Sequence, residues 1–170
     1  MQKSVTKKLN QSVKIIKTAL FWAVLLLVSD RLLKITALNY WSEHQINLFP
    51  GWSLTYSLNH NIAFSLPWSG FSLLISLTAV TLFLTLIALY QIKKQPTRIW
   101  GWSFLLAGTY SNLYDRFIYG GVIDYLTNWW TIFNLADVLI IIGLSAILLS
   151  SGHSRQHQPE PPVSTFPDQY

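Results

Sequence analysis

The chain has 170 residues, of which 51% are hydrophobic and 11% are charged, and its mean hydropathy is +0.35. Because a soluble domain usually carries about 25% charged residues, this composition argues against an ordinary soluble domain and favours one bundle of membrane helices. The absence of cysteine excludes disulfides and Cys-based zinc sites, and the net charge of +5 does not indicate a nucleic-acid partner, since the basic residues cluster at the ends of apolar segments.

Four apolar segments are long enough, or nearly so, to cross about 30 Å of hydrocarbon. They cover residues 18–38, 71–92, 99–117 and 132–149. The first contains Asp30 and Lys34, the second has no charge, and the third is weakened by glycine and polar residues. The sequence therefore predicts an α-helical integral membrane protein with four transmembrane helices.

The segment between the first two predicted helices, residues 39–70, contains a strand pattern. Its stretch WSLTYSLN, residues 52–59, alternates apolar and polar side chains over eight positions. A period of two is typical of a strand with two different faces. We therefore expect a small extracytoplasmic β-structure at the membrane surface.

Lysine and arginine predict the orientation. Nine of the twelve basic residues lie before the first segment, between the second and third, or after the fourth, and this side should be cytoplasmic. Residues 1–17 are then a basic cytoplasmic N-terminus, residues 18–150 form the membrane domain, and the Pro-rich residues 151–170 form a disordered cytoplasmic tail. No small-residue cleavage site follows the first apolar run, so we interpret it as a retained anchor helix rather than a signal peptide.

Four aspartates fall near the outer leaflet in this orientation, namely Asp30, Asp115, Asp124 and Asp137. A carboxylate at a helix centre costs about 2.5–3.5 kcal/mol on insertion scales. Such a group is retained because it is paired, faces a wet cavity, or takes part in function.

The sequence neighbours of the aspartates suggest different roles. Asp30 and Lys34 have the i, i+4 spacing of an ion pair on one helix face. Asp115 is followed by Arg116, and a charge cluster at the end of a helix explains it as well as catalysis does. Asp124 and Asp137 have no adjacent basic residue. Asp137 could complement the dipole at a helix start or have a functional role.

Two unpaired carboxylates brought together share a proton and titrate as a unit. One can take a proton from water while the other donates to a carbonyl or a leaving amine, which is peptide hydrolysis without a metal. The four histidines form no HExxH motif, and no G-x-S-x-G motif or P-loop is present. We therefore expect neither a metal nor another cofactor.

Four motifs in chain order resemble those of the lipoprotein signal peptidase (signal peptidase II) family, over about residues 18–150. They are Asp30-x-x-x-Lys34, the stretch NHNIAFS at 59–65, NLYDR at 112–116 followed by Gly120, Val122 and Asp124, and FNLAD at 133–137. Together on a four-helix frame with both ends inside, they form a specific combination.

The resemblance implies an aspartic endopeptidase of the bacterial inner membrane, with its site near the outer face. It would cut diacylglyceryl-modified prolipoproteins just before the lipidated cysteine, with Asp124 and Asp137 as the catalytic dyad. We expect it to be a monomer surrounded by membrane lipids, with a β-structure that cradles the substrate. The residues expected to bind substrate or support the dyad are Asp30, Lys34, Asn59, Asn112, Asp115, Arg116, Asn134 and Ala136.

The chain departs from the family pattern at four positions. Asn61 and Ile62 stand where the family usually has Gly-Ala, Ser111 stands where a glycine is usual, and Val138 stands where a small polar residue is common. Larger side chains could narrow a pocket or repack the helices. We expect effects on substrate preference rather than on reaction type.

Two other functions compete with the peptidase. A proton relay of a transporter would use acids staggered through the membrane, whereas these four fall in one layer. A catalytically inactive protein of the same fold could bind lipid or peptide in the same pocket, and the sequence leaves this alternative open.

Overall fold

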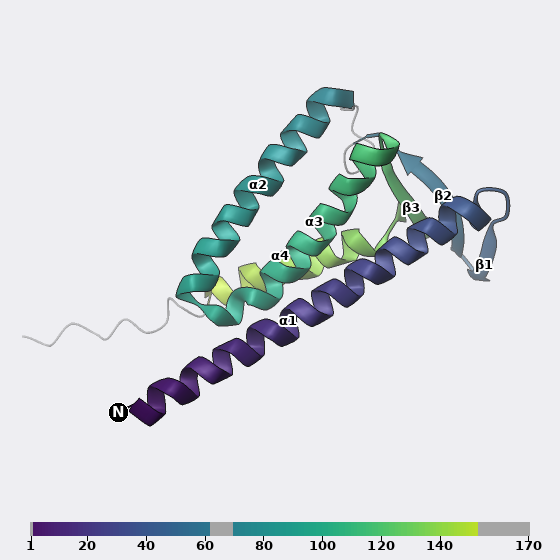
Figure 1. Cartoon of the computed structure of the whole chain (residues 1–170). Helices are drawn as coiled ribbons and strands as arrows, with labels where there is room; N and C mark the ends of the chain where they lie inside the picture. Colours follow the sequence, from purple (N-terminus) through teal and green to yellow (C-terminus); the bar gives the residue numbers. More distant parts are fainter. Residues whose placement is uncertain (1, 62–69, 153–170) are drawn as a thin grey trace, which may run out of the picture.

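The computed structural model describes residues 2–61 and 70–152. The long helices lie together, and a small sheet lies at one end of them, beside the last turns of α1 and α3 (Figure 1). The helices are α1 (Gln2–Thr36), α2 (Gly70–Lys94), α3 (Ile99–Tyr119) and α4 (Leu135–Gly152). A π-helical turn, Ala37–Trp41, continues α1, and a 3₁₀ turn, Pro96–Arg98, precedes α3.

The four apolar segments of the sequence correspond to the four helices, with different ends. The first helix begins at Gln2 rather than near residue 18, so the basic N-terminal residues belong to the same helix. The fourth begins at Leu135, because Ile132 and Phe133 form a strand instead. The predicted tail lies outside the described residues, apart from Ser151 and Gly152 at the end of α4.

Two helical stretches are long and apolar enough to cross a membrane, Leu9–Trp41 and Gly70–Lys94, and Leu135–Ser150 is apolar but shorter. Large apolar side chains on α2 point outward, including Phe71, Phe83 and Leu86. Exposed apolar side chains along an entire helix fit contact with lipid rather than with water. These features are those of a membrane protein.

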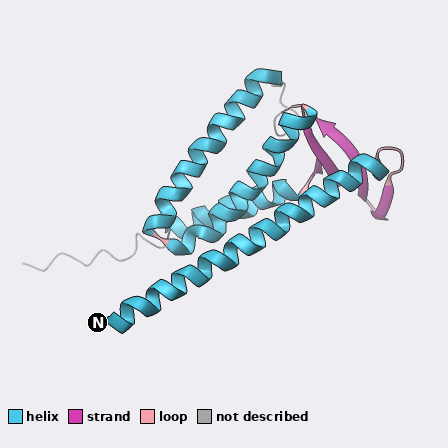
Figure 2. Cartoon of the chain, in the orientation of Figure 1, coloured by secondary structure: helices cyan, strands magenta, loops and turns pink. Residues whose placement is uncertain are grey.

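The sheet is antiparallel in the order β1-β2-β3-β4, and its strands are magenta in Figure 2. Its strands are β1 (Ile46–Phe49), β2 (Trp52–Asn59), β3 (Val122–Thr127) and β4 (Ile132–Phe133). The predicted strand 52–59 is confirmed as β2. The β-structure expected between the first two helices is present as β1 and β2, and the sheet is larger than expected, because β3 and β4 between α3 and α4 extend it.

Strand β3 has the sequence VIDYLT, in which β-branched and aromatic residues favour a strand. It pairs with β2 so that Ser57 lies opposite Asp124 and Asn59 lies opposite Val122. Asp124 is therefore held on one of the two central strands of the sheet.

The closest helix contact joins α3 and α4. A Cβ atom at Gly108 would lie 2.3 Å from the carbonyl oxygen of Ala136, and one at Gly143 would lie 2.4 Å from the backbone nitrogen of Leu105. Only glycine fits at such a backbone contact, which is typical of membrane helices packed through small residues. Gly108, one of the residues that weaken the apolar pattern of α3, therefore allows the start of α4 to pack closely against α3.

Candidate functional site

Four aspartates from four different elements converge where the helices meet the sheet. Asp30 lies on α1, Asp115 on α3, Asp124 on β3 and Asp137 in the first turn of α4. Asp30 and Asp115 are fully buried, and Asp124 is 4% exposed. The fold therefore gathers carboxylates that are up to about a hundred positions apart in the sequence.

Asp30 and Asp115 form a buried ion cluster with two cations. The Nζ atom of Lys34 lies 3.1 Å from Oδ2 of Asp30 and 2.7 Å from Oδ2 of Asp115. It also donates a hydrogen bond of 2.8 Å to Oδ1 of Asn112, which occupies its third donor. The predicted pair between Asp30 and Lys34 is confirmed.

The partner predicted for Asp115 is wrong. Its carboxylate lies 2.6 Å from Nη1 of Arg31 and bonds to Lys34, whereas Arg116 donates to the backbone oxygens of His60 and Asn61, at 3.5 and 2.7 Å. Consecutive residues of a helix point in different directions, so neighbours in sequence do not face each other. With Arg31 included, the cluster has two positive and two negative groups and its formal charges cancel.

Asn134 and Asp137 form a capping box at the start of α4. Oδ1 of Asn134 accepts from the backbone N–H of Asp137 at 3.0 Å, and Oδ2 of Asp137 accepts from the backbone N–H of Asn134 at 3.2 Å. This reciprocal arrangement satisfies donors that the helix itself leaves free. The helix-start environment expected for Asp137 is therefore present, and it also fixes the direction of the carboxylate.

The same asparagine connects the two predicted dyad residues. Nδ2 of Asn134 donates to Oδ1 of Asp124 at 2.6 Å, so its side chain contacts the Asp124 carboxylate and the backbone of Asp137 together. Asn59 donates to Oδ2 of Asp124 at 3.3 Å, and Asn112 donates to Oδ1 of Asp137 at 2.8 Å. Each oxygen of the two carboxylates thus receives one neutral N–H donor, and all three asparagines singled out by the sequence take part.

Asp124 and Asp137 have no cationic partner within residues 2–61 and 70–152, where the ion pairs join only Arg31 and Lys34 to the other two aspartates. Burial, and secondly the charge of Asp137, raise the pKa of Asp124 to about 6, although hydrogen bonds from Asn134 and Asn59 oppose the rise. Two such carboxylates are expected to hold a proton between them near neutral pH.

Ala136 contributes through its backbone. The residue is fully buried, its carbonyl lies against Gly108 of α3, and its N–H donates to Oδ1 of Asp30 at 3.2 Å. The positions where the chain departs from the family pattern are partly described. The backbone N–H of Asn61 donates to Oδ1 of Asn59 at 3.0 Å, which orients the amide that reaches Asp124. Ile62 lies outside the described residues, and nothing in the structure explains Val138.

Three residues of the site were not assigned a role from sequence. Arg31 pairs with Asp115, and the hydroxyls of Ser111 and Tyr125 donate to the carboxylate of Asp30. Arg31 could have been suspected as a charge inside an apolar segment. No local pattern could have found the contacts of Ser111 and Tyr125, because their partner lies 81 and 95 positions away.

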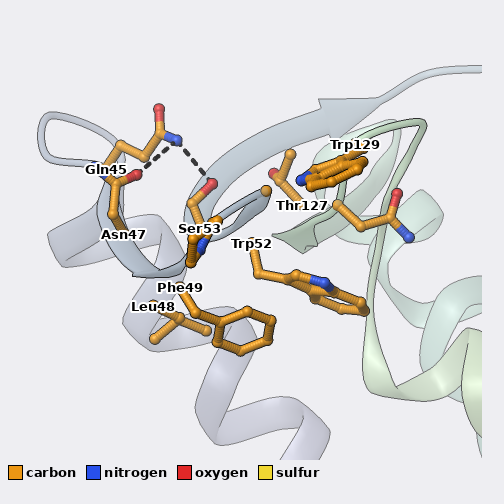
Figure 3. Close-up of a pocket in the computed structure, with 11 residues that line it drawn as sticks. Gln45, Asn47, Leu48, Phe49, Trp52, Ser53, Thr127 and Trp129 are labelled. Carbon is orange, nitrogen blue, oxygen red and sulfur yellow. Dashed lines mark hydrogen bonds between the residues drawn. The ribbon is translucent and has the colours of Figure 1, made fainter.

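A separate pocket of about 620 Å³ lies at the far end of the sheet, around the β1–β2 turn (Figure 3). Gln45 bridges Asn47 and Ser53 on one side, and the ring of Trp129 lies against Gly51. Its lining has no charged residue, so it offers no group for acid–base chemistry. Among the described residues, no three His, Asp or Glu side chains are arranged to hold a metal ion.

Known proteins match most of the chain. A family model described as signal peptidase (SPase) II matches residues 22–152. A lipoprotein signal peptidase of Shewanella sediminis is 32% identical over 147 residues, which cover 77% of this chain and 81% of that relative. A second lipoprotein signal peptidase, of Chlorobium phaeovibrioides, is 33% identical over 152 residues, which cover 77% of this chain and 90% of that relative.

Solved structures share the fold. A bacterial membrane enzyme determined by the in meso method at 2.3 Å resolution matches with a TM-score of 0.73 at 23% identity, over 86% of this chain and 94% of that chain. A second bacterial membrane enzyme, determined by the same method at 1.9 Å resolution, matches with a TM-score of 0.68 at 22% identity. The match covers 79% of this chain and 92% of that chain. The arrangement of helices and sheet is therefore shared with these two solved proteins.

Proposed function

Since the chain belongs to the signal peptidase II family, we propose that it is an intramembrane aspartic endopeptidase that acts on lipoprotein precursors. It removes the signal peptide of a diacylglyceryl-modified prolipoprotein by cutting just before the lipidated cysteine. The observation that carries this proposal is the pair Asp124 and Asp137, two buried carboxylates joined through one asparagine and supplied with neutral donors only.

The chemistry follows from one shared proton. The ionised carboxylate removes a proton from a water molecule, whose oxygen attacks the carbonyl carbon of the scissile peptide, while the protonated carboxyl donates its proton to the carbonyl oxygen. The tetrahedral intermediate then collapses as the leaving amine is protonated. Asn134, Asn59 and Asn112 hold the two carboxylates in fixed directions throughout.

The proposed topology has four spans, with both termini in the cytoplasm and the dyad near the outer face of the inner membrane. It is supported by the basic residues around the α2–α3 connection and by the sheet at the opposite end of the helices (Figure 1). Trp129 and Trp130 are strongly exposed beside that sheet, as is common at a membrane–water interface. In this arrangement a monomer meets its lipid-anchored substrate from the surrounding lipid.

A gel-shift assay with a purified diacylglyceryl-modified prolipoprotein tests the function. The wild-type protein should convert the precursor to its cleaved form, and Asp124→Asn and Asp137→Asn should each lower the rate at least about a thousandfold, since the acid–base pair is lost. Both variants should remain folded and membrane-inserted. Glu43→Gln, which changes an exposed acid outside the site, should retain wild-type activity.

Two results would count against the proposal. Full activity in either Asn variant would end the assignment of the dyad. A folded wild-type protein that does not cleave an authentic lipidated precursor would end the peptidase assignment itself.

A further inference from the structure

Asp30 lies between the two elements that carry the proposed dyad, although it belongs to neither. Oδ1 accepts from the hydroxyl of Tyr125 on β3 and from the backbone N–H of Ala136 on α4, both at 3.2 Å. Oδ2 faces Lys34 and accepts from Ser111 on α3 at 2.5 Å. One carboxylate on α1 therefore joins the other three elements of the site.

Tyr125 makes the most direct connection. It follows Asp124 in the chain, it is 3% exposed, and its ring packs against Trp41 with the centroids 6.2 Å apart. Its hydroxyl donates to Asp30 and accepts from the backbone N–H of Leu135 at 3.0 Å. A single phenol oxygen thus connects β3 to the first residue of α4.

The first N–H groups of a helix have no acceptor within the helix. In α4 the first three are held from outside, Leu135 by Tyr125, Ala136 by Asp30 and Asp137 by Asn134. Two of these three bonds depend on the unit formed by Asp30 and Tyr125. The unit therefore determines where α4 begins relative to β3, and so how Asp137 stands relative to Asp124.

The hydroxyls of Tyr125 and Ser111 are both suited to hold the carboxylate of Asp30 in place. Burial, together with the nearby charge of Asp30, raises the pKa of Tyr125, so its phenol keeps its proton and remains a donor. Ser111 is 2% exposed and contacts the carboxylate from α3. Charge-assisted hydrogen bonds to a carboxylate are stronger than bonds between neutral groups, so two such donors fix its rotamer.

We propose that Tyr125 and Ser111 are positioning residues for the reaction, whose hydroxyls hold Asp30 and through it set the start of α4 against β3. This inference rests on the peptidase function proposed above. Neither hydroxyl touches the substrate; both act by fixing the geometry of the dyad.

The variants Tyr125→Phe and Ser111→Ala each delete one hydroxyl and leave the remaining packing in place. Each should lower kcat about tenfold with KM changed less than about twofold, because a small displacement of a catalytic group slows the chemical step. The double variant should lose less than the product of the single effects, since both hydroxyls act through Asp30. Tyr56→Phe on β2 and Thr109→Val on α3 are matched controls and should behave as wild type.

Hydrogen exchange of the backbone amides at residues 135–137, followed by mass spectrometry on the purified protein, gives a second measurement that does not require activity. Tyr125→Phe should raise exchange at these amides, because the acceptor of Leu135 is removed. The Tyr56→Phe control should not.

Unchanged exchange at residues 135–137 in Tyr125→Phe would overturn the inference, as would wild-type kcat in both single variants of an active enzyme. Strictly multiplicative losses in the double variant would show that the hydroxyls do not act through one carboxylate. If the wild-type protein fails to cleave the precursor, the proposed function falls, while the exchange measurement still decides whether Tyr125 positions α4.

Discussion

Two pairs of aspartates lie at the same end of the molecule, and they differ in the groups that surround them. Asp30 and Asp115 face Lys34 and Arg31 at 2.6–3.4 Å. Asp124 and Asp137 receive hydrogen bonds from amide N–H groups, and no cation of the described chain pairs with them.

This difference separates structural from chemical carboxylates. The carboxylates of Asp30 and Asp115 are engaged by cations, and buried ion pairs of this kind hold elements together. Two buried acids held only by neutral donors cannot both ionise easily, so one of them retains a proton. The cluster around Lys34 therefore holds α1 against α3, whereas the second pair is able to act as acid and base.

Lys34→Met should have the largest effect on stability. It leaves Asp30 and Asp115 buried with only the partly exposed Arg31 as a cation. Removal of one partner from a buried ion pair typically costs about 3–5 kcal/mol, so the unfolding free energy in detergent should fall by that amount. Lys93→Met, at an exposed site on α2, is the control. A loss below about 1 kcal/mol would contradict the structural role of the cluster.

Most of the fold was predictable because its signals are local. The apolar runs predicted four helices, and alternation over residues 52–59 predicted β2. The strand β3 was missed because six residues with an aspartate in the middle show too short a pattern, and it becomes stable only through pairing with β2. The start of α4 was misplaced because Ile132 and Phe133 are apolar but belong to β4.

The candidate site was predictable at the level of residue identity rather than contact. Asp124, Asp137 and their asparagines stood out because they are polar in an apolar chain. The partner of Asp115 was wrong because Arg116 was chosen by adjacency, whereas Arg31 is brought to it by packing of α1 on α3. Tyr125 was missed because its hydroxyl acts on a residue of a distant helix.

The second largest effect is expected for Asp124→Asn, which should change how the unfolding free energy depends on pH. Burial raises the pKa of Asp124 from 3.8 to about 6, so ionisation of this group opposes folding. Its contribution to stability is complete below about pH 4 and is lost as the pH rises through about 6. The loss has an upper limit of about 3 kcal/mol at 1.36 kcal/mol per pKa unit.

The measurement is the unfolding free energy of the wild type minus that of Asp124→Asn, between pH 4 and pH 8, in which the contributions of the acids outside the dyad cancel. This difference should fall as the pH rises through about 6, because the folded protein disfavours the ionised form of Asp124. Asp115→Asn supplies the contrast, because removing an ion-paired carboxylate should destabilise the protein at pH 8. A difference for Asp124→Asn that rises with pH would mean that the folded protein favours the ionised form of Asp124, contrary to the raised pKa.

Asn59→Ala should have the smallest effect, on the pH profile of cleavage. The Asn59 amide donates to Oδ2 of Asp124 at 3.3 Å and stabilises the ionised form, so its removal should raise the pKa of Asp124 above about 6. If the singly protonated dyad is active, kcat/KM falls as the pH rises through this pKa. The falling limb should then move to higher pH by up to about one unit, with a modest loss of maximal rate.

The control is Asn47→Ala, which changes an exposed asparagine on β1 and should leave the pH profile of cleavage unchanged. A limb that moves to lower pH would show that Asn59 favours the protonated form of Asp124, and the neutral-donor environment would then not distinguish the catalytic pair from the structural one.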